Sequence, residues 1–291
     1  MSSTEGGAMS KEIHSTDGPS SDLHGKIAIV TGATGTMGRL IALELGKRGA
    51  AIAGLGRRAE KGAEFVRAAE NAGVQAHFFE CDVSDRSQVD RAVAKVLSNL
   101  GGAHIVVNNA AATDLIRTGQ SGMVADESDE VFDQMMKVNV YGAFWLAKGV
   151  IPTMLEQGDG RFVSISSINA LRAMSGMASY GPSKAALEAL TRQIANDYGV
   201  QGIRANSVLL GVIRTPESAV ASDDPVQGPL RNSMQMIQRP GTAEELARLV
   251  AFLASDDSSF MTGAVVAFDG GGSARWALPG SINKFFASKS A

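Results

Sequence analysis

The sequence predicts a single α/β domain in which a parallel sheet is covered by helices on both faces. Short runs of β-branched and other apolar residues alternate with longer amphipathic segments between residues 26 and 273. These apolar runs do not alternate with polar residues, which is typical of strands buried on both faces. No internal repeat or linker interrupts the pattern. We therefore expect one doubly wound domain with a seven-stranded parallel sheet.

Each expected strand is a short apolar run, and each expected helix is a longer segment whose apolar residues recur three and four positions apart. From the N-terminus, the strands are expected at residues 27–30, 50–55, 77–80, 104–107, 161–165, 204–209 and 264–268. The helices are expected at residues 39–47, 59–71, 86–100, 130–155, 179–198 and 243–254.

Two segments lack this rhythm, and both follow the carboxyl ends of expected strands. Residues 112–128 form a polar loop, and residues 216–238 form an excursion that contains proline, serine and methionine. Ligands of open α/β sheets bind beyond the carboxyl ends of the strands, so both segments are candidate walls of a substrate site. For residues 112–128, an ordinary surface loop is an equally good interpretation.

The two ends of the chain carry no such pattern. Residues 1–25 are rich in serine, glycine, threonine and charge, and we expect them to form a disordered tail. Residues 274–291 form a C-terminal extension that carries Trp276, Phe285 and Phe286. This extension either caps the active-site cleft of a neighbouring subunit or is a loose end.

Composition excludes several classes of function. The net charge of −3 and the isoelectric point of about 5.9 predict no affinity for nucleic acid or for an anionic membrane. Cys81 is the only cysteine, which excludes a disulfide within the chain and a zinc site of several thiolates, and we expect no metal. No histidine follows His104, so a hydrolytic triad with its histidine last is excluded. No apolar stretch is long enough for a membrane span or a signal peptide core, and we expect a cytoplasmic protein.

A glycine-rich turn, Thr31 to Gly38, lies between the first strand and the first helix. Glycines here let backbone N–H groups approach a pyrophosphate, and the positive end of the helix dipole adds to the attraction. Glycine at such a turn also serves tight packing of the strand against the helix. We favour phosphate binding, with contacts expected from Gly32, Thr34, Gly35, Met37 and Gly38.

The residues after the second strand indicate which dinucleotide binds. A fold that selects NAD usually offers an acid to the adenosine ribose about 20 residues past the turn. Here the strand ends in Gly54-Leu55-Gly56-Arg57-Arg58, and the next acid is Glu60. Guanidinium groups pair with a 2′-phosphate, whereas a carboxylate repels it, so Arg57 and Arg58 favour NADP(H). NAD remains open, because Glu60 could reach the ribose and both arginines could be solvated.

Tyr180 and Lys184 lie four residues apart in the fifth expected helix, which places the phenol and the ammonium on one helix face. An ordinary tyrosine has a pKa of about 10, too high for efficient proton transfer near neutral pH. A neighbouring cation should lower that pKa. Ser167 directly follows a strand, where its hydroxyl could hydrogen-bond a substrate oxygen.

With these residues in this order, the sequence resembles the short-chain dehydrogenase/reductase family, and within it the shorter 3-oxoacyl-reductase-like branch. The resemblance covers residues 26–273 and implies a Rossmann fold. The matching stretches are Thr31 to Gly38, Cys81-Asp82-Val83-Ser84-Asp85, Asn108-Asn109-Ala110-Ala111, Val138-Asn139-Val140, Ser166-Ser167, Tyr180-Gly-Pro-Ser-Lys184, Ile203-Arg-Ala-Asn-Ser207, Thr262-Gly263 and Asp269-Gly270-Gly271. So many motifs in the family's order make the resemblance specific.

The resemblance implies a role for each catalytic candidate. Tyr180 would be the general acid in reduction and the general base in oxidation. Lys184 would hold the nicotinamide ribose and lower the pKa of the tyrosine. Ser167 would position the carbonyl oxygen, and Asn139 would support a water-linked proton relay from the lysine.

The resemblance also implies cofactor contacts. Asp82 and Val83 would border the adenine, while Ile213 and Thr215 would meet the nicotinamide carboxamide. Family members are commonly tetramers, so a homotetramer or a homodimer is expected. The adenosine and ribose side would be lined by Asn108, Asn109 and Ala110.

Three positions depart from the family's pattern. The usual turn is TGxxxGxG, but Thr36 stands in place of the middle glycine. The turn instead fits TGxxGxxG, a spacing of the longer epimerase-like branch, which leaves the pyrophosphate geometry open. Ala111 stands where glycine is usual, and Leu210 stands where proline is common, which could alter the loop over the nicotinamide.

The sequence thus predicts an oxidoreductase that passes a hydride between NADP(H) and a ketone or secondary alcohol. The alternatives are an NAD-dependent dehydrogenase of the same family, an epimerase or dehydratase, and a nucleotide-binding sensor without catalysis. Such a sensor normally lacks the tyrosine or the lysine, and both are present here. A hydrophobic substrate would suit the methionines of the candidate walls, which core packing explains equally well: Met174, Met177, Met234 and Met236.

Overall fold

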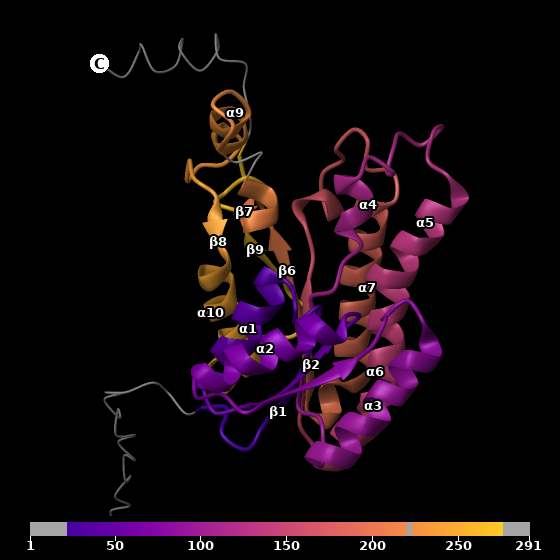
Figure 1. Ribbon diagram of the computed structural model, residues 1–291, viewed down its shortest axis with the longest axis vertical. Helices are drawn as coiled ribbons and strands as arrows, with labels where there is room; N and C mark the ends of the chain where they lie inside the picture. Colours follow the sequence, from indigo (N-terminus) through magenta and orange to yellow (C-terminus); the bar gives the residue numbers. More distant parts are fainter. Residues whose placement is uncertain (1–21, 220–222, 276–291) are drawn as a thin grey trace, which may run out of the picture.

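The computed structural model describes residues 22–219 and 223–275 and has the predicted layered architecture (Figure 1). Most of the predicted tail and extension, including Trp276, Phe285 and Phe286, lies outside the described residues. The described chain begins earlier than the predicted domain start at residue 26. Residues 22–25 form a turn, Leu23 is fully buried, and its N–H donates to the Arg48 carbonyl at 3.0 Å.

The main sheet has seven parallel strands in the order β3-β2-β1-β4-β5-β6-β9, which confirms the predicted doubly wound fold class. The order reverses between β1 and β4, where Ala28 pairs with Ile105 and Val30 with Val107. Ligands of such sheets bind at this reversal, beyond the carboxyl ends of the strands. The strands are β1 (Ile27–Thr31), β2 (Ala51–Gly56), β3 (Ala76–Glu80), β4 (Ile105–Asn108), β5 (Gly160–Ile165), β6 (Ile203–Leu210) and β9 (Val265–Phe268).

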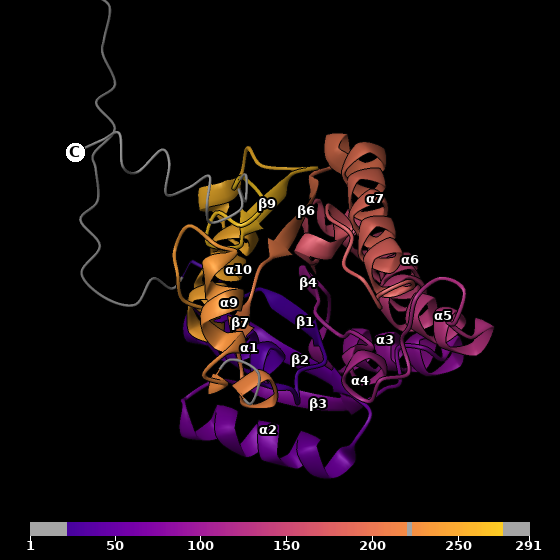
Figure 2. The ribbon, with the colours of Figure 1, turned by 90° about the horizontal axis from the view of Figure 1, so that it is seen from above.

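Helices cover both faces of this sheet (Figure 2). Side chains of β1 point alternately to the two faces, so Ala28 and Val30 join one hydrophobic core and Ile27 and Ile29 the other. The first core is covered by α1 (Thr36–Lys47), α2 (Ala59–Asn71) and α10 (Ala243–Ala254), and the second by α3 (Arg86–Leu100), α6 (Gly142–Gln157) and α7 (Tyr180–Tyr198). Within the described ranges, no helix is both long and apolar enough to cross a membrane.

Local sequence sets the ends of several helices. The carboxylate of Asp85 caps α3 by accepting the backbone N–H groups of Ser87 and Gln88. Thr242 opens α10 with a capping box that includes Glu245. Because these signals lie next to the helices they start, the predicted bounds of α3 and α10 agree with the structure.

The structure differs from the prediction between β4 and β5. The helix expected at residues 130–155 is divided into α5 (Asp129–Met136), a π-helical stretch η1 (Lys137–Tyr141) and α6. Hydrogen bonds in a π-helix span five residues rather than four, a change that apolar spacing does not reveal.

Short elements also occupy segments that were expected to be irregular. The helix α4 (Thr113–Arg117) lies in the predicted polar loop, and α9 (Gln227–Ser233) lies in the second excursion. A small parallel pair, β7 (Ile213–Arg214) with β8 (Gly241–Thr242), brackets that excursion. The 3₁₀ turns are η2 (Ile168–Ala170), η3 (Gly199–Gln201), η4 (Pro216–Ser218) and η5 (Asp256–Ser258).

Two arginines hold the C-terminal end of α10 against the sheet. Arg161 on β5 is 5% exposed, and its guanidinium donates to the Ala254 carbonyl at 3.0 Å and to Asp256 Oδ1 at 2.8 Å. Arg204 on the neighbouring strand β6 donates to two further carbonyls at the same helix end. The last carbonyls of a helix lack partners within it and carry partial negative charge, so these guanidiniums satisfy them.

Replacing Arg161 with methionine should lower the free energy of unfolding by about 2 to 3 kcal/mol, because the Ala254 carbonyl loses its donor and Asp159 and Asp256 lose a cationic partner. Urea denaturation measures the change. Arg86→Met is the matched control, since Arg86 forms an exposed ion pair with Asp90 and should cost less than about 0.5 kcal/mol. Equal losses in the two variants would contradict the assigned role of Arg161.

Candidate active site

The glycine turn joins β1 to α1 at the point where the strand order reverses. Gly32 has a φ of 66°, a conformation that L side chains rarely adopt. A Cβ at Gly38 would lie 2.2 Å from the Gly32 carbonyl oxygen, so this position also requires glycine. Gly35 has an ordinary φ of −83° and precedes α1 without capping it through a side chain. Its lack of a side chain keeps the helix N-terminus open.

The end of β4 is tied to this turn. The Thr31 hydroxyl accepts the backbone N–H groups of Asn109 and Ala110, each at 3.0 Å. The Asn109 amide donates to the Thr31 carbonyl at 2.9 Å, and the buried Asn108 amide donates to the Ser164 hydroxyl at 3.3 Å. Among the described residues, the buried Oδ1 atoms of both asparagines find no hydrogen-bond partner. Such atoms are rare unless a function uses them.

These features fit the pyrophosphate of a dinucleotide. The first N–H groups of α1 have no partner within the helix, and the helix dipole makes this end attractive to an anion. The glycines leave room for a ligand to approach the backbone. Thr34 and Met37 lie in the same turn, and a Cβ at Gly56, the last residue of β2, would lie 3.2 Å from Thr34 Oγ1. The ends of β1 and β2 therefore meet at the glycine turn.

Arg57 and Arg58 follow β2 and are exposed. Arg57 Nη2 lies 3.4 Å from Asp114 Oδ2 on α4, and the Asp114 Oδ1 atom lies 2.6 Å from Arg117 Nη2. Sequence reasoning missed this acid, because the contact joins residues 57 positions apart. The three-residue spacing of Asp114 and Arg117 is the only local signal of an ion pair here.

The segment after β7 returns to the glycine turn. Thr215 opens η4 with a capping box, and the Glu217 carboxylate of that turn accepts from Thr36 Oγ1 at 3.2 Å and 3.3 Å. Burial raises the pKa of Glu217, but hydrogen bonds and the Arg117 charge outweigh burial and lower it. Thr36, which replaces the middle glycine, therefore makes a side-chain contact that glycine could not make.

Tyr180 begins α7, and Lys184 follows one helical turn later with 2% exposure. Lys184 Nζ donates to the Ile165 carbonyl at 2.8 Å and lies 5.8 Å from the centre of the Tyr180 ring. Burial lowers the pKa of Lys184 from 10.5 to about 8, although the Glu188 charge opposes this. The phenol and the amine thus lie together at the carboxyl end of β5.

The pKa of Tyr180 departs from the expectation. Burial raises it above 10.0, and a hydrogen bond with Ser167 offsets only part of the rise. The predicted lowering of this pKa is therefore wrong, because loss of solvent is the largest effect on the phenol. The neighbouring Lys184 amine donates to the Ile165 carbonyl. Tyr180 is a neutral phenol at pH 7.

Ser167 and Asn139 both approach the first turn of α7. Ser167 directly follows β5 and caps η2. Asn139 belongs to the π-helical stretch η1, is 2% exposed, and donates from Nδ2 to Ser183 Oγ at 2.8 Å. The Ser183 hydroxyl in turn donates to the Tyr180 carbonyl at 2.7 Å. The amide of Asn139 is thereby fixed against the first turn of α7.

The remaining predicted contacts lie at the same edge of the sheet. Asp82 follows β3 and accepts hydrogen bonds from the N–H and the hydroxyl of Ser84. Val83 is buried against the start of α6, and Ile213 is half-buried on β7. Among the described residues, no group of three or more His, Cys, Asp or Glu side chains could hold a metal ion.

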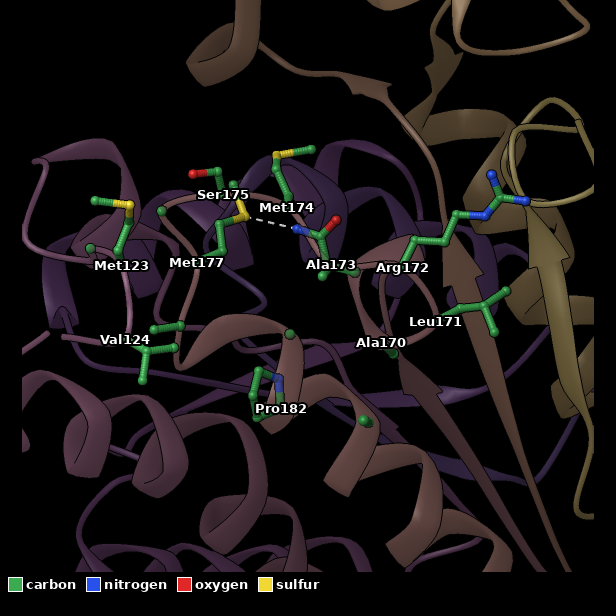
Figure 3. Close-up of a pocket in the computed structure, with 16 residues that line it drawn as sticks. Met123, Val124, Ala170, Leu171, Arg172, Ala173, Met174, Ser175, Met177 and Pro182 are labelled. Carbon is green, nitrogen blue, oxygen red and sulfur yellow. Dashed lines mark hydrogen bonds between the residues drawn. The ribbon is translucent and has the colours of Figure 1, made fainter. Parts of the chain in front are cut away.

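A cavity of about 530 Å³ lies beside the start of α7 (Figure 3). Its walls are residues 122–124, residues 169–178 and the start of α7, and Met123, Met174 and Met177 supply much of the apolar surface. Of these lining residues, Asn169 lies two positions after Ser167, and Gly181 directly follows Tyr180. The lining does not include the predicted wall residues Met234 and Met236.

The buried amine of Lys184 should make stability depend on pH. Its pKa is about 8 in the folded chain and 10.5 ordinarily, so the unfolded chain binds more protons between these values. Stability relative to Lys184→Met should therefore rise by about 3 kcal/mol as pH rises from 8 to 10.5. Denaturant unfolding of both proteins at several pH values measures this, and a constant difference would contradict the burial argument.

Comparison with known proteins agrees with this geometry. Residues 32–273 match the family model described as Enoyl-(Acyl carrier protein) reductase. The chain is 36% identical over 249 residues to 2-(R)-hydroxypropyl-CoM dehydrogenase of Xanthobacter autotrophicus, covering 84% of this chain and 97% of that protein. It is 34% identical over 252 residues to 3-oxoacyl-[acyl-carrier-protein] reductase FabG of Pseudomonas aeruginosa, covering 86% and 98%.

Solved structures are similar over the same region. Gluconate 5-dehydrogenase from Burkholderia cenocepacia, in complex with NADP and tartrate, has a TM-score of 0.82 and 28% identity and covers 89% of this chain and 99% of that chain. NAD+-bound xylitol dehydrogenase has a TM-score of 0.78 and 32% identity and covers 86% and 99%. Fold, motif order and these matches agree, and the chain belongs to the short-chain dehydrogenase/reductase family.

Proposed function

We propose that this chain is an NADP(H)-dependent oxidoreductase that interconverts a ketone and a secondary alcohol, with Tyr180 as general acid and base. The observation that carries the proposal is the pair on α7 formed by the half-buried Tyr180 and the buried Lys184, with Ser167 hydrogen-bonded to the phenol. The pair lies at the end of β5, beside the strand reversal where a cofactor would bind. Family membership supports oxidoreductase chemistry at this place.

The residues present can perform the proton transfer. In reduction, the Ser167 hydroxyl donates a hydrogen bond to the substrate carbonyl oxygen, and Tyr180 gives its proton to that oxygen as negative charge develops. The nicotinamide, when bound, supplies the hydride. A tyrosine is already protonated at neutral pH, and burial raises the pKa of Tyr180 further, so Tyr180 is in the state that reduction requires. In oxidation, the phenolate form of Tyr180 removes the alcohol proton, and the hydrogen bond with Ser167 favours that phenolate.

Lys184 and Asn139 would also serve the cofactor side of the reaction. Lys184 would bind the nicotinamide ribose, and Asn139 would orient a water that relays protons to it. A cavity of about 10 Å³, lined by Asn108 and Asn139 among others, is near the lower limit for one water. Further proposed contacts are Gly32, Thr34, Gly35, Met37 and Gly38 to the pyrophosphate, Asp82 and Val83 to the adenine, Asn108, Asn109 and Ala110 to the adenosine side, and Ile213 and Thr215 to the carboxamide.

The preference for NADP(H) is supported by Arg57 and Arg58 at the end of β2. Both side chains are exposed and can pair with a 2′-phosphate, and no carboxylate of their own strand end competes before Glu60. Structural relatives hold either cofactor, since one has NADP bound and another NAD+. NAD is therefore the alternative cofactor.

The substrate class is proposed from the methionine-lined cavity beside Tyr180. Thioether side chains fit apolar groups of varied shape, so we propose a hydrophobic carbonyl compound or alcohol. We further propose a cytoplasmic homotetramer or homodimer. Aromatic side chains remain exposed on α5, η1 and α6, as suits burial against a second copy: Phe132, Tyr141 and Phe144.

Tyr180→Phe should lower kcat by roughly 10²- to 10⁴-fold, because the variant has no proton to transfer. NADPH binding should be unchanged. Turnover is followed as loss of nicotinamide absorbance with a panel of ketones, of which the apolar members should react fastest. Tyr198→Phe, at the far end of the same helix, is the control and should keep full activity.

Equal activity in Tyr180→Phe would overturn the assigned mechanism. If the wild-type chain binds NADPH but reduces no ketone, the epimerase or dehydratase and the sensor without catalysis move ahead of the reductase. If it binds neither nucleotide, the variant glycine turn does not work as argued.

Replacing both Arg57 and Arg58 with alanine should weaken NADPH binding by roughly tenfold or more and leave NADH binding nearly unchanged, since only NADPH has the 2′-phosphate. Fluorescence titration of each nucleotide measures this. A parallel loss of affinity for both nucleotides would show that the arginines are not selective.

A further inference from the structure

Two carboxylates lie at the places where the proposed function puts the phosphates of the cofactor. The first is Glu217, whose two oxygens are 3.2 Å and 3.3 Å from Thr36 Oγ1 at the N-terminus of α1. A helix N-terminus attracts a carboxylate for the same reason that it attracts a phosphate, because its N–H groups are unpaired and its dipole is positive. Glu217 therefore presents negative charge at the turn that would bind the pyrophosphate.

The second carboxylate is Asp114, which lies 3.4 Å from Arg57 Nη2. Arg57 and Asp114 are 61% and 57% exposed, so their ion pair is weak and open to exchange. A 2′-phosphate carries more charge than a carboxylate and pairs strongly with a guanidinium. Asp114 thus holds the cation that the 2′-phosphate would need.

Arg117 lies between the two carboxylates. Its Nη2 atom is 2.6 Å from Asp114 Oδ1, and its charge helps to lower the pKa of Glu217. If Asp114 releases Arg57, it therefore keeps Arg117 as its cationic partner. Because α4 follows β4 and η4 follows β7, the two carboxylates come from different strand ends.

We propose that Asp114 and Glu217 are specificity-determining residues that compete with the phosphates of the cofactor, Asp114 at Arg57 and Glu217 at the N-terminus of α1. This inference rests on the proposed function. Asp114 competes only with NADP(H), because NAD(H) has no 2′-phosphate. Glu217 competes with both nucleotides equally, because both have the pyrophosphate. Asp114 therefore sets cofactor preference, whereas Glu217 sets overall affinity.

Fluorescence titration of the full chain with NADPH and with NADH tests the proposal. Asp114→Asn should lower the Kd for NADPH by about two- to fivefold and leave the Kd for NADH unchanged. Glu217→Gln should lower both Kd values by the same factor, also about two- to fivefold. Asp197→Asn removes one exposed charge near the C-terminal end of α7, roughly 25 Å along that helix from Tyr180, and should change neither Kd.

An unchanged or weaker NADPH affinity in Asp114→Asn would overturn the role of Asp114, because the aspartate would then position Arg57 or do nothing. A change of NADPH affinity alone in Glu217→Gln would overturn the role of Glu217. Equal tightening in Asp197→Asn would reduce both effects to net charge. Failure of the wild-type chain to bind either nucleotide would instead contradict the proposed function.

Discussion

The hydrogen bonds of the Thr31 hydroxyl fix the edge of the sheet on which the candidate site depends. This hydroxyl accepts the N–H groups of Asn109 and Ala110 and donates to the Val107 carbonyl at 3.3 Å. It joins β1 to β4 just beyond their last paired residues, Val30 and Val107. Because the strand order reverses here, the connections on either side diverge and leave a crevice. The glycine turn and the two asparagines are thus held at a set separation.

A second constraint is the buried amine of Lys184, whose burial lowers the free energy of unfolding while holding the amine beside Tyr180. A buried ammonium normally requires an anion, yet Lys184 has a backbone carbonyl of Ile165 as its close acceptor, with the Glu188 charge acting on it as well. Burial has opposite effects on the two side chains of the Tyr180–Lys184 pair: it raises the pKa of Tyr180 and lowers that of Lys184. The two pKa values lie close together in water and are moved apart in the folded chain, so that the amine loses its proton at a lower pH than the phenol.

The sequence predicted the parts of the molecule that depend on neighbours along the chain. Buried strands are readable as apolar runs, the caps of α3 and α10 lie beside their helices, and the spacing of Tyr180 and Lys184 alone puts them on one helix face. The contacts of Arg57 with Asp114 and of Thr36 with Glu217 could not be predicted, since each joins distant segments through short elements without strong periodicity. The raised pKa of Tyr180 also escaped prediction, because burial depends on the whole fold.

The π-helical stretch at Lys137–Tyr141 joins α5 to α6 in one continuous helix, which contains one residue more than regular α-helical hydrogen bonding would need there. Deleting one residue there would restore ordinary helical hydrogen bonding and rotate one part of the helix against the other by about 100°. The α6 part is locked by core residues such as Leu146 and Val150, so the rotation would fall on α5 and on the amide of Asn139. The number of residues in this stretch therefore sets the direction of the Asn139 amide without changing how α6 packs. An insertion or a deletion would change that direction, whereas a substitution would leave the number of residues unchanged.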